Sequence, residues 1–159
     1  MQQVQQPDSP KKLLWRTLLK QGNDFYSKEQ WLNAELVYFQ AYEVLSKECQ
    51  NYPNDTDTLM AWICTCHNLS TLFEAQGELR TSLHYLLLPQ DYCRALLEKN
   101  ESCEEVRLLA IQALSVTWTP IVEFSKKYPN IQHCGQNAMK HTTSPVNRGS
   151  KAASQSMLH

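Results

Sequence analysis

Glycine is scarce in this sequence. It occupies four of 159 positions, and no segment alternates apolar and polar residues as a half-buried strand does. Both absences argue against strands joined by tight turns, so helices are favoured. Apolar runs are short too: no stretch approaches the roughly 20 apolar residues that a transmembrane helix needs. The polar first six residues do not form a secretory signal peptide. We therefore expect a cytoplasmic protein without a membrane partner.

Catalytic motifs are also missing. The chain has no G-x-S-x-G string around a nucleophilic serine, no phosphate-binding P-loop and no H-E-x-x-H zinc string. The adjacent carboxylates of Glu104 and Glu105 are better explained by a helix start, where the helix dipole favours acidic residues. We expect a protein that is not an enzyme and that holds no cofactor.

Charge is nearly balanced, at a net −1, which predicts neither nucleic acid nor a membrane surface as the main partner. The distribution is uneven. All 16 acidic residues but only 12 of the 15 basic ones precede residue 130, which gives that part a charge of −4. The segment 130–159 carries three basic residues, no acid and little to bury, so we expect a disordered basic tail. A lead of residues 1–8 is expected to be flexible.

The most informative stretch runs from Gly22 to Ala41. Small and aromatic residues alternate there at helical spacings, which suits two antiparallel helices joined by a turn near residues 28–30. The small residues let the helices approach closely, and the aromatic rings fill the space between them. The residues are Gly22, Phe25, Trp31, Ala34, Tyr38 and Ala41.

This pattern resembles the tetratricopeptide repeat, a helix hairpin that recurs about every 34 residues. A second, less regular copy follows, with Ser70 and Phe73 in place of Gly22 and Phe25, then Gly77, Ser82 and Leu86. The two copies are 48 residues apart, so we expect longer helices and a longer connecting loop. The resemblance implies an interaction scaffold built from stacked helix hairpins.

We accordingly predict an all-α domain over residues 9–129 with about five helices in antiparallel hairpins. Ser9 and Ser102 are expected to cap the first and fifth helices. Pro89 is expected to kink or briefly break the fourth helix, and Thr119-Pro120 to kink or restart the fifth. The fifth helix is expected to cover the open face of the second hairpin. The predicted helices span about 9–26, 28–49, 56–76, 79–99 and 102–127.

In tetratricopeptide repeats that clamp a peptide terminus, asparagines line the inner surface. This sequence has Asn23 and Asn68 at two of those positions, and an amide side chain can pair with both peptide N–H and C=O groups. The clamp lysine expected four residues before Asn23 is Leu19 here, so the resemblance implies a peptide groove rather than a carboxylate clamp. The expected contacts are Asn23, Asn68, Arg16, Lys20 and Tyr26.

Two alternatives remain open at this point. In the first, the groove face pairs with a second copy in a homodimer; in the second, the cysteines serve a metal- or redox-responsive regulator. Cys64 and Cys66 would point about 200° apart on a helix, so they do not suit one metal ion. We expect reduced packing thiols and no metal. The four tryptophans, Trp15, Trp31, Trp62 and Trp118, lie at or beside apolar stripes and are expected to pack in the core.

Overall fold

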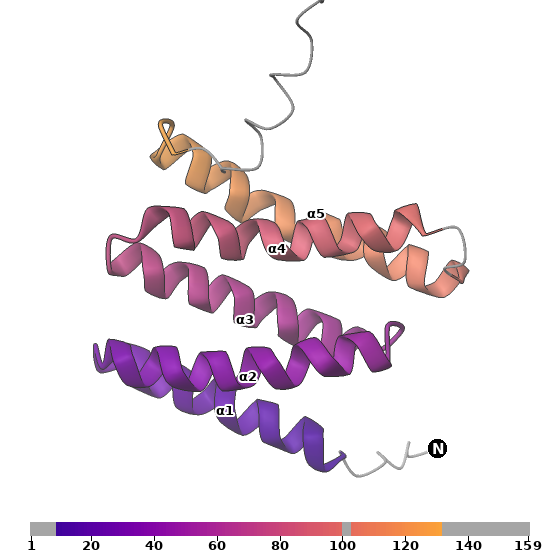
Figure 1. The fold of residues 1–159 in the computed structure, drawn as a ribbon, viewed down its shortest axis with the longest axis horizontal. Helices are drawn as coiled ribbons and strands as arrows, with labels where there is room; N and C mark the ends of the chain where they lie inside the picture. The colour runs from indigo at the N-terminus through magenta and orange to yellow at the C-terminus, as the bar shows by residue number, and fades with distance from the viewer. Residues whose placement is uncertain (1–8, 100–102, 132–159) are drawn as a thin grey trace, which may run out of the picture.

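The structure is a computed structural model, and it describes residues 9–99 and 103–131. Over these residues it contains five α-helices and no strand (Figure 1). The predicted all-α class and the order of the helices are confirmed. The predicted lead 1–8, the predicted cap Ser102 and residues 132–159 of the predicted tail lie outside the described residues. The helices are α1 (Pro10–Ser27), α2 (Trp31–Asn51), α3 (Thr56–Ala75), α4 (Leu79–Glu98) and α5 (Glu104–Lys127).

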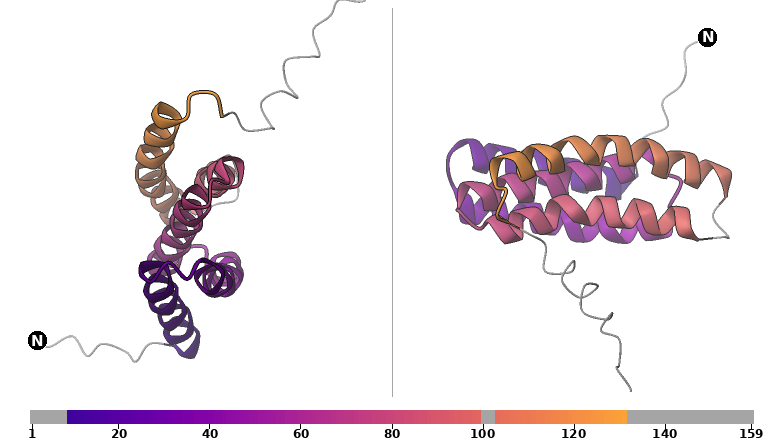
Figure 2. Two further views of the ribbon diagram at one scale, coloured as in Figure 1. Left: turned by 90° about the vertical axis from the view of Figure 1, so that its left-hand side faces the viewer. Right: turned by 90° about the horizontal axis from the view of Figure 1, so that it is seen from above.

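The helices stack in two rows. Each packs against the next one along the chain, and α3 also touches α1 and α5. The first row therefore contains α1, α3 and α5, and the second row contains α2 and α4 (Figure 2). The backbones of neighbours in the first row approach each other, whereas α2 and α4 are bridged by side chains of α4, such as Tyr92, whose hydroxyl donates to Cys49 O at 3.3 Å. The first row is therefore the more closely spaced side of the stack. As expected, α5 lies over the second hairpin, where it packs on α4.

The two hairpin turns repeat one hydrogen-bond pattern 48 residues apart. In the first turn, Gln30 N donates to Phe25 O at 3.0 Å; in the second, Glu78 N donates to Phe73 O at 2.8 Å. In both turns the residue just before the donor has a positive φ, 56° at Glu29 and 81° at Gly77. The 48-residue offset read from the sequence is therefore present in the backbone.

Small residues bring the helices of each hairpin together, but with different chemistry. A Cβ on Gly22 would lie 2.4 Å from Cε1 of Tyr38, so α2 occupies the space that a side chain would need. In the second hairpin Ser70 stands where the first has Gly22, and Ser82 stands where the first has Ala34; their buried hydroxyls form a 2.8 Å hydrogen bond. The close approach expected from the sequence thus occurs in both copies.

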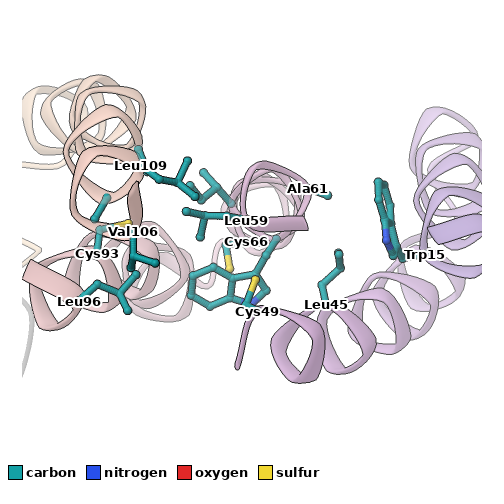
Figure 3. Close-up of a cluster of buried hydrophobic side chains, with 14 residues drawn as sticks. Trp15, Leu45, Cys49, Leu59, Ala61, Cys66, Cys93, Leu96, Val106 and Leu109 are labelled. Carbon is teal, nitrogen blue, oxygen red and sulfur yellow. The ribbon is translucent and has the colours of Figure 1, made fainter. Parts of the chain in front are cut away.

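One core cluster draws on all five helices (Figure 3). Trp15 and Trp62 are buried in it, and Trp62 Nε1 donates to Ser46 Oγ at 2.9 Å. The expectation that every tryptophan packs in the core is wrong for Trp118, whose side chain lies at the surface beside Gln90 and Arg94 of α4 and is 55% exposed. The buried members include Leu45, Cys49, Leu59, Ile63, Cys66, Cys93, Leu96, Val106 and Leu109.

Neither internal proline interrupts its helix. α4 continues through Pro89 and α5 through Pro120, so the expected break at Pro89 and the restart at Thr119 do not occur. A proline removes one backbone hydrogen bond and crowds the preceding turn. Pro89 is fully buried between neighbouring helices, and this packing offsets the missing bond. Tertiary contacts therefore override the local tendency of proline to break a helix.

By length and composition alone, α5 could cross a membrane. An 18-residue window in it has a mean hydropathy of 1.3, and 28% of that window is buried. The expectation that no segment has the length and hydropathy of a transmembrane helix is therefore too strict. A core helix of a protein outside the membrane passes the same test, and α5 contributes to the core. That the protein has no membrane partner stays a prediction.

Candidate functional site

Asn23 and Asn68 meet on the first row of helices. Asn23 comes from α1 and Asn68 from α3, and Asn68 Nδ2 donates to Asn23 Oδ1 at 3.3 Å. The Tyr38 hydroxyl donates to the same oxygen at 2.7 Å. Burial raises the pKa of Tyr38 to about 12, so this hydroxyl stays protonated and keeps donating at neutral pH. The carboxamide of Asn23 is thus fixed from two sides.

The pair leaves one donor group and one acceptor group facing outward. Asn23 Nδ2 and Asn68 Oδ1 form no hydrogen bond with any other described residue. Asn23 is exposed and Asn68 is half-buried. Because a peptide group also offers one donor and one acceptor, a chain lying along this surface can pair with both amides.

The other three predicted contact residues lie on α1 with different surroundings. Arg16 and Lys20 are exposed, and the Arg16 guanidinium lies 5.2 Å from the ring centre of Trp15. Tyr26 is half-buried, and its ring packs edge-on against Trp31 with centres 5.2 Å apart. Arg16, which is two helical turns from Asn23, falls on the same face of α1. Arg16 and Lys20 thus precede Asn23 on the same helix, and Tyr26 lies near its end, at the hairpin turn.

A cavity of about 340 Å³ opens beside this surface, between α3 and α5. Leu86 of α4 lines it, and the lining residue His67 directly precedes Asn68 in the chain. Sequence reasoning missed the cavity, because it arises where two helices far apart in the chain face each other. Its lining consists of His67, Ser70, Thr71, Glu74, Leu86, Pro120, Glu123, Phe124 and Lys127.

His67 is the chemically distinctive residue of this cavity. Its Nε2 atom is buried and has no hydrogen-bond partner among the described residues. Burial lowers the pKa of His67, so the imidazole is neutral at pH 7. A buried polar atom without a partner costs free energy, and a ligand group that enters the cavity could supply one.

One ion pair links α3 to α5 at the edge of the cavity. The Lys127 ammonium donates to Glu74 Oε1, and the Tyr128 hydroxyl donates to the same oxygen at 3.0 Å. The hydrogen bond from Lys127 lowers the pKa of Glu74, against the opposing effect of burial, and the bond from Tyr128 lowers it further. The pair holds the end of α5 over the cavity.

Among the described cysteines, Cys49, Cys66 and Cys93 are buried in the same core cluster, whereas Cys64 and Cys103 are exposed. Cys66 is fully buried and Cys64 is exposed, on opposite sides of α3 as helical geometry requires. Burial raises the pKa of Cys49 to about 12 and that of Cys93 to about 11, so both thiols are protonated and unreactive at neutral pH. Over residues 9–99 and 103–131, no three or more His, Cys, Asp or Glu side chains come close enough to hold a metal ion. Cys134 is outside the described residues.

Comparison with known proteins gives one family. The model of the family described as "Protein of unknown function (DUF2753)" matches residues 13–157. The chain belongs to this family. No curated protein and no solved structure matches the chain. In this DUF2753 protein the asparagine pair and the α3–α5 cavity both fall within the matched region.

We expect the Glu74–Lys127 pair to make the stability of this DUF2753 protein depend on pH. Because the folded-state pKa of Glu74 is lowered, its contribution is present above the unfolded pKa and is lost as pH falls through the folded pKa. At pH 7, Glu74→Gln should lower the melting temperature by about 2–4 °C, as expected for a partly exposed ion pair. At pH 3 the difference should shrink towards zero.

Thermal melts followed by circular dichroism at both pH values test this expectation. Glu43→Gln is the matched control, because Glu43 is an exposed acid of α2. It should leave the melting temperature unchanged at either pH. A Glu74→Gln deficit of equal size at pH 7 and pH 3 would show that the ion pair is not its cause.

Proposed function

We propose that this protein is a non-enzymatic protein–protein interaction module, an adaptor or chaperone-like protein that binds an extended peptide segment along its first row of helices. The observation that carries the proposal is the Asn23–Asn68 pair. Two carboxamides from positions 45 residues apart in the chain present a donor and an acceptor side by side. An extended peptide offers the complementary groups along its backbone.

The surroundings of the pair support the same function. The amides are held by Tyr38 and by each other, so little freedom is lost when a ligand pairs with them. The adjacent cavity has room for one side chain of a bound segment, with a neutral imidazole at its wall. The resemblance to the tetratricopeptide repeat adds support, because that family binds peptides along the first helix of each hairpin.

Arg16, Lys20 and Tyr26 complete the proposed contact surface. The two basic side chains are exposed on α1 and can approach an acidic residue or a carbonyl oxygen of the bound segment. The half-buried ring of Tyr26 offers an apolar edge at the hairpin turn. We further propose a cytoplasmic location and binding without a cofactor.

Selection from a phage-displayed library of random linear peptides tests the proposal. Wild-type protein should enrich a related set of sequences. Asn23→Ala combined with Asn68→Ala should weaken binding of those peptides by about 30-fold, because two hydrogen bonds of about 1 kcal/mol each are lost. Fluorescence anisotropy with a labelled peptide from the selection measures the change.

Asn33→Ala combined with Asn51→Ala is the matched control, because both amides are exposed on α2 in the second row. It should leave affinity unchanged. Circular dichroism must accompany the test, since Asn23→Ala also removes the acceptor of the Tyr38 hydroxyl. Equal affinity of the folded double variant and the wild type would refute the proposal, as would failure of the wild type to enrich any sequence.

A further inference from the structure

The outward side of α5 carries large apolar side chains that no described residue covers. α5 is the last helix of the stack (Figures 1 and 2), and its inner side packs on α4 and α3. On the other side Leu108 and Ile111 are each 56% exposed and Trp118 is 55% exposed. Stacked-helix proteins ordinarily end in a polar face, because the last unit has no further neighbour. This helix presents the kind of face that another helix covers.

Residues on this side form one continuous line along α5, and all of them are exposed except Val122, which is half-buried. They are spaced four and three residues apart, the spacing that keeps side chains on one face of a helix and that forms the seam of a coiled coil. At 1.5 Å per residue the line extends over roughly 33 Å. We call it the α5 seam, and it consists of Glu104, Leu108, Ile111, Ser115, Trp118, Val122 and Lys126.

Charged and apolar residues of the α5 seam are placed symmetrically about its central residue, Ser115. Ser115 is at its midpoint, with Glu104 eleven residues before it and Lys126 eleven residues after it. Leu108 and Val122 likewise lie seven residues to either side. A second copy running antiparallel across Ser115 would therefore place each glutamate opposite a lysine and each leucine opposite a valine. Parallel pairing would place glutamate opposite glutamate.

We propose that the protein forms a homodimer through the α5 seam, antiparallel about a twofold axis at Ser115. The small side chain of Ser115 lets the two helices approach closely at the axis. Beside it, a hollow of about 470 Å³ between α4 and α5, lined in part by Trp118 and Arg94, can accept a side chain of the second copy. In this twofold contact both copies use the same set of seam residues.

The charges at the seam ends favour a second copy over other occupants. An acidic first turn and a basic last turn suit any helix dipole, but here one residue of each kind lies on the apolar face itself. Glu104 and Lys126 form no ion pair with another described residue. A membrane surface would bring Glu104 against lipid headgroups together with the apolar side chains, which is unfavourable on an anionic bilayer.

Light scattering coupled to size exclusion, over a concentration series, tests the dimer. Ile111→Glu should weaken it by roughly 100-fold or more, because the substitution places a charge in both halves of the contact. Leu32→Glu is the matched control: Leu32 is 81% exposed on α2, away from the seam, and its replacement should leave the dimer intact. Both sites are exposed, so both variants should fold.

A charge exchange tests the register. Glu104→Lys alone and Lys126→Glu alone each place like charges opposite one another and should weaken the dimer by about tenfold. Glu104→Lys combined with Lys126→Glu restores opposite charges across the axis and should recover wild-type affinity. Only antiparallel pairing gives this recovery.

Several results would overturn the dimer proposal. They are a wild type that remains monomeric at its highest soluble concentration, a dimer that survives Ile111→Glu, assemblies larger than dimers, and no recovery in the charge exchange. Binding of monomeric protein to phosphatidylcholine and phosphatidylserine vesicles through the same residues would also overturn it, in favour of a membrane. Asn23→Ala with Asn68→Ala should leave the dimer intact, so this proposal and the peptide-binding proposal can fail separately.

Discussion

Replacing Gly22 by alanine should destabilise the protein by about 2 kcal/mol, despite the better helix propensity of alanine. The new Cβ would lie 2.4 Å from Cε1 and 2.6 Å from Cδ1 of Tyr38. That ring is 2% exposed and is held among buried side chains of α2 and α3. It has little freedom to move, and any movement strains its hydrogen bond to Asn23. The melting temperature should fall by roughly 6–8 °C.

Two further variants make this result specific. Gln21→Ala, on the exposed side of the same helical turn, should leave the melting temperature unchanged or raise it slightly. Adding Tyr38→Leu to Gly22→Ala should destabilise less than the two single effects combined, because leucine lacks the ring atoms that meet the new methyl group. A melting temperature for Gly22→Ala equal to or above that of wild type would contradict the close packing of α1 on α2.

Truncation of Leu72 to alanine should cost about 3 kcal/mol. Leu72 is fully buried in the cluster where α3 meets the first hairpin, together with Ala34, Tyr38, Leu69 and Phe73. Removing its side chain leaves a cavity that rigid helices on both sides cannot close. Since the free energy of unfolding of a domain of this size is only about 5–15 kcal/mol, the substitution removes a large share of it. Urea unfolding followed by circular dichroism measures it as a lower transition midpoint.

Leu32→Ala provides the comparison, because it removes the same atoms from an exposed position on α2. Its free energy of unfolding should differ from that of wild type by less than about 0.5 kcal/mol. The slope of free energy against urea should be the same for both variants. Equal losses for Leu72→Ala and Leu32→Ala would mean that α3 does not pack on the first hairpin as described.

Local sequence was sufficient for the helices and turns. Ser9 accepts a hydrogen bond from Lys12 N at 3.3 Å at the predicted first cap, and the turn predicted near residues 28–30 falls between α1 and α2. These features depend on neighbours within a few residues. Gly77 shows the same dependence, since its φ of 81° suits glycine and its sequence position marks the turn. The expected break at Pro89 and restart at Thr119-Pro120 do not occur, because continuity of a helix through proline depends on contacts from other helices.

The candidate site was only partly predictable. The resemblance to a known repeat singled out Asn23 and Asn68, and the fold brings them together. The cavity beside them was missed because it requires α5 to lie against α3, and no short-range pattern encodes that distance. The significance of His67 comes from its buried Nε2 atom, and only the fold shows that this atom has no partner among the described residues.

The sequence by itself determined which segments are helical, where the hairpins turn and that the two hairpins are related by 48 residues, because helix periodicity, caps and turns are set by residues close in the chain. Tertiary structure alone decided which helix faces are covered. Trp118 illustrates the difference: its apolar character indicated burial, yet α5 is the last helix of the stack and no described element lies over that side. Burial depends on what packs against a residue, and that is settled only when the helices assemble.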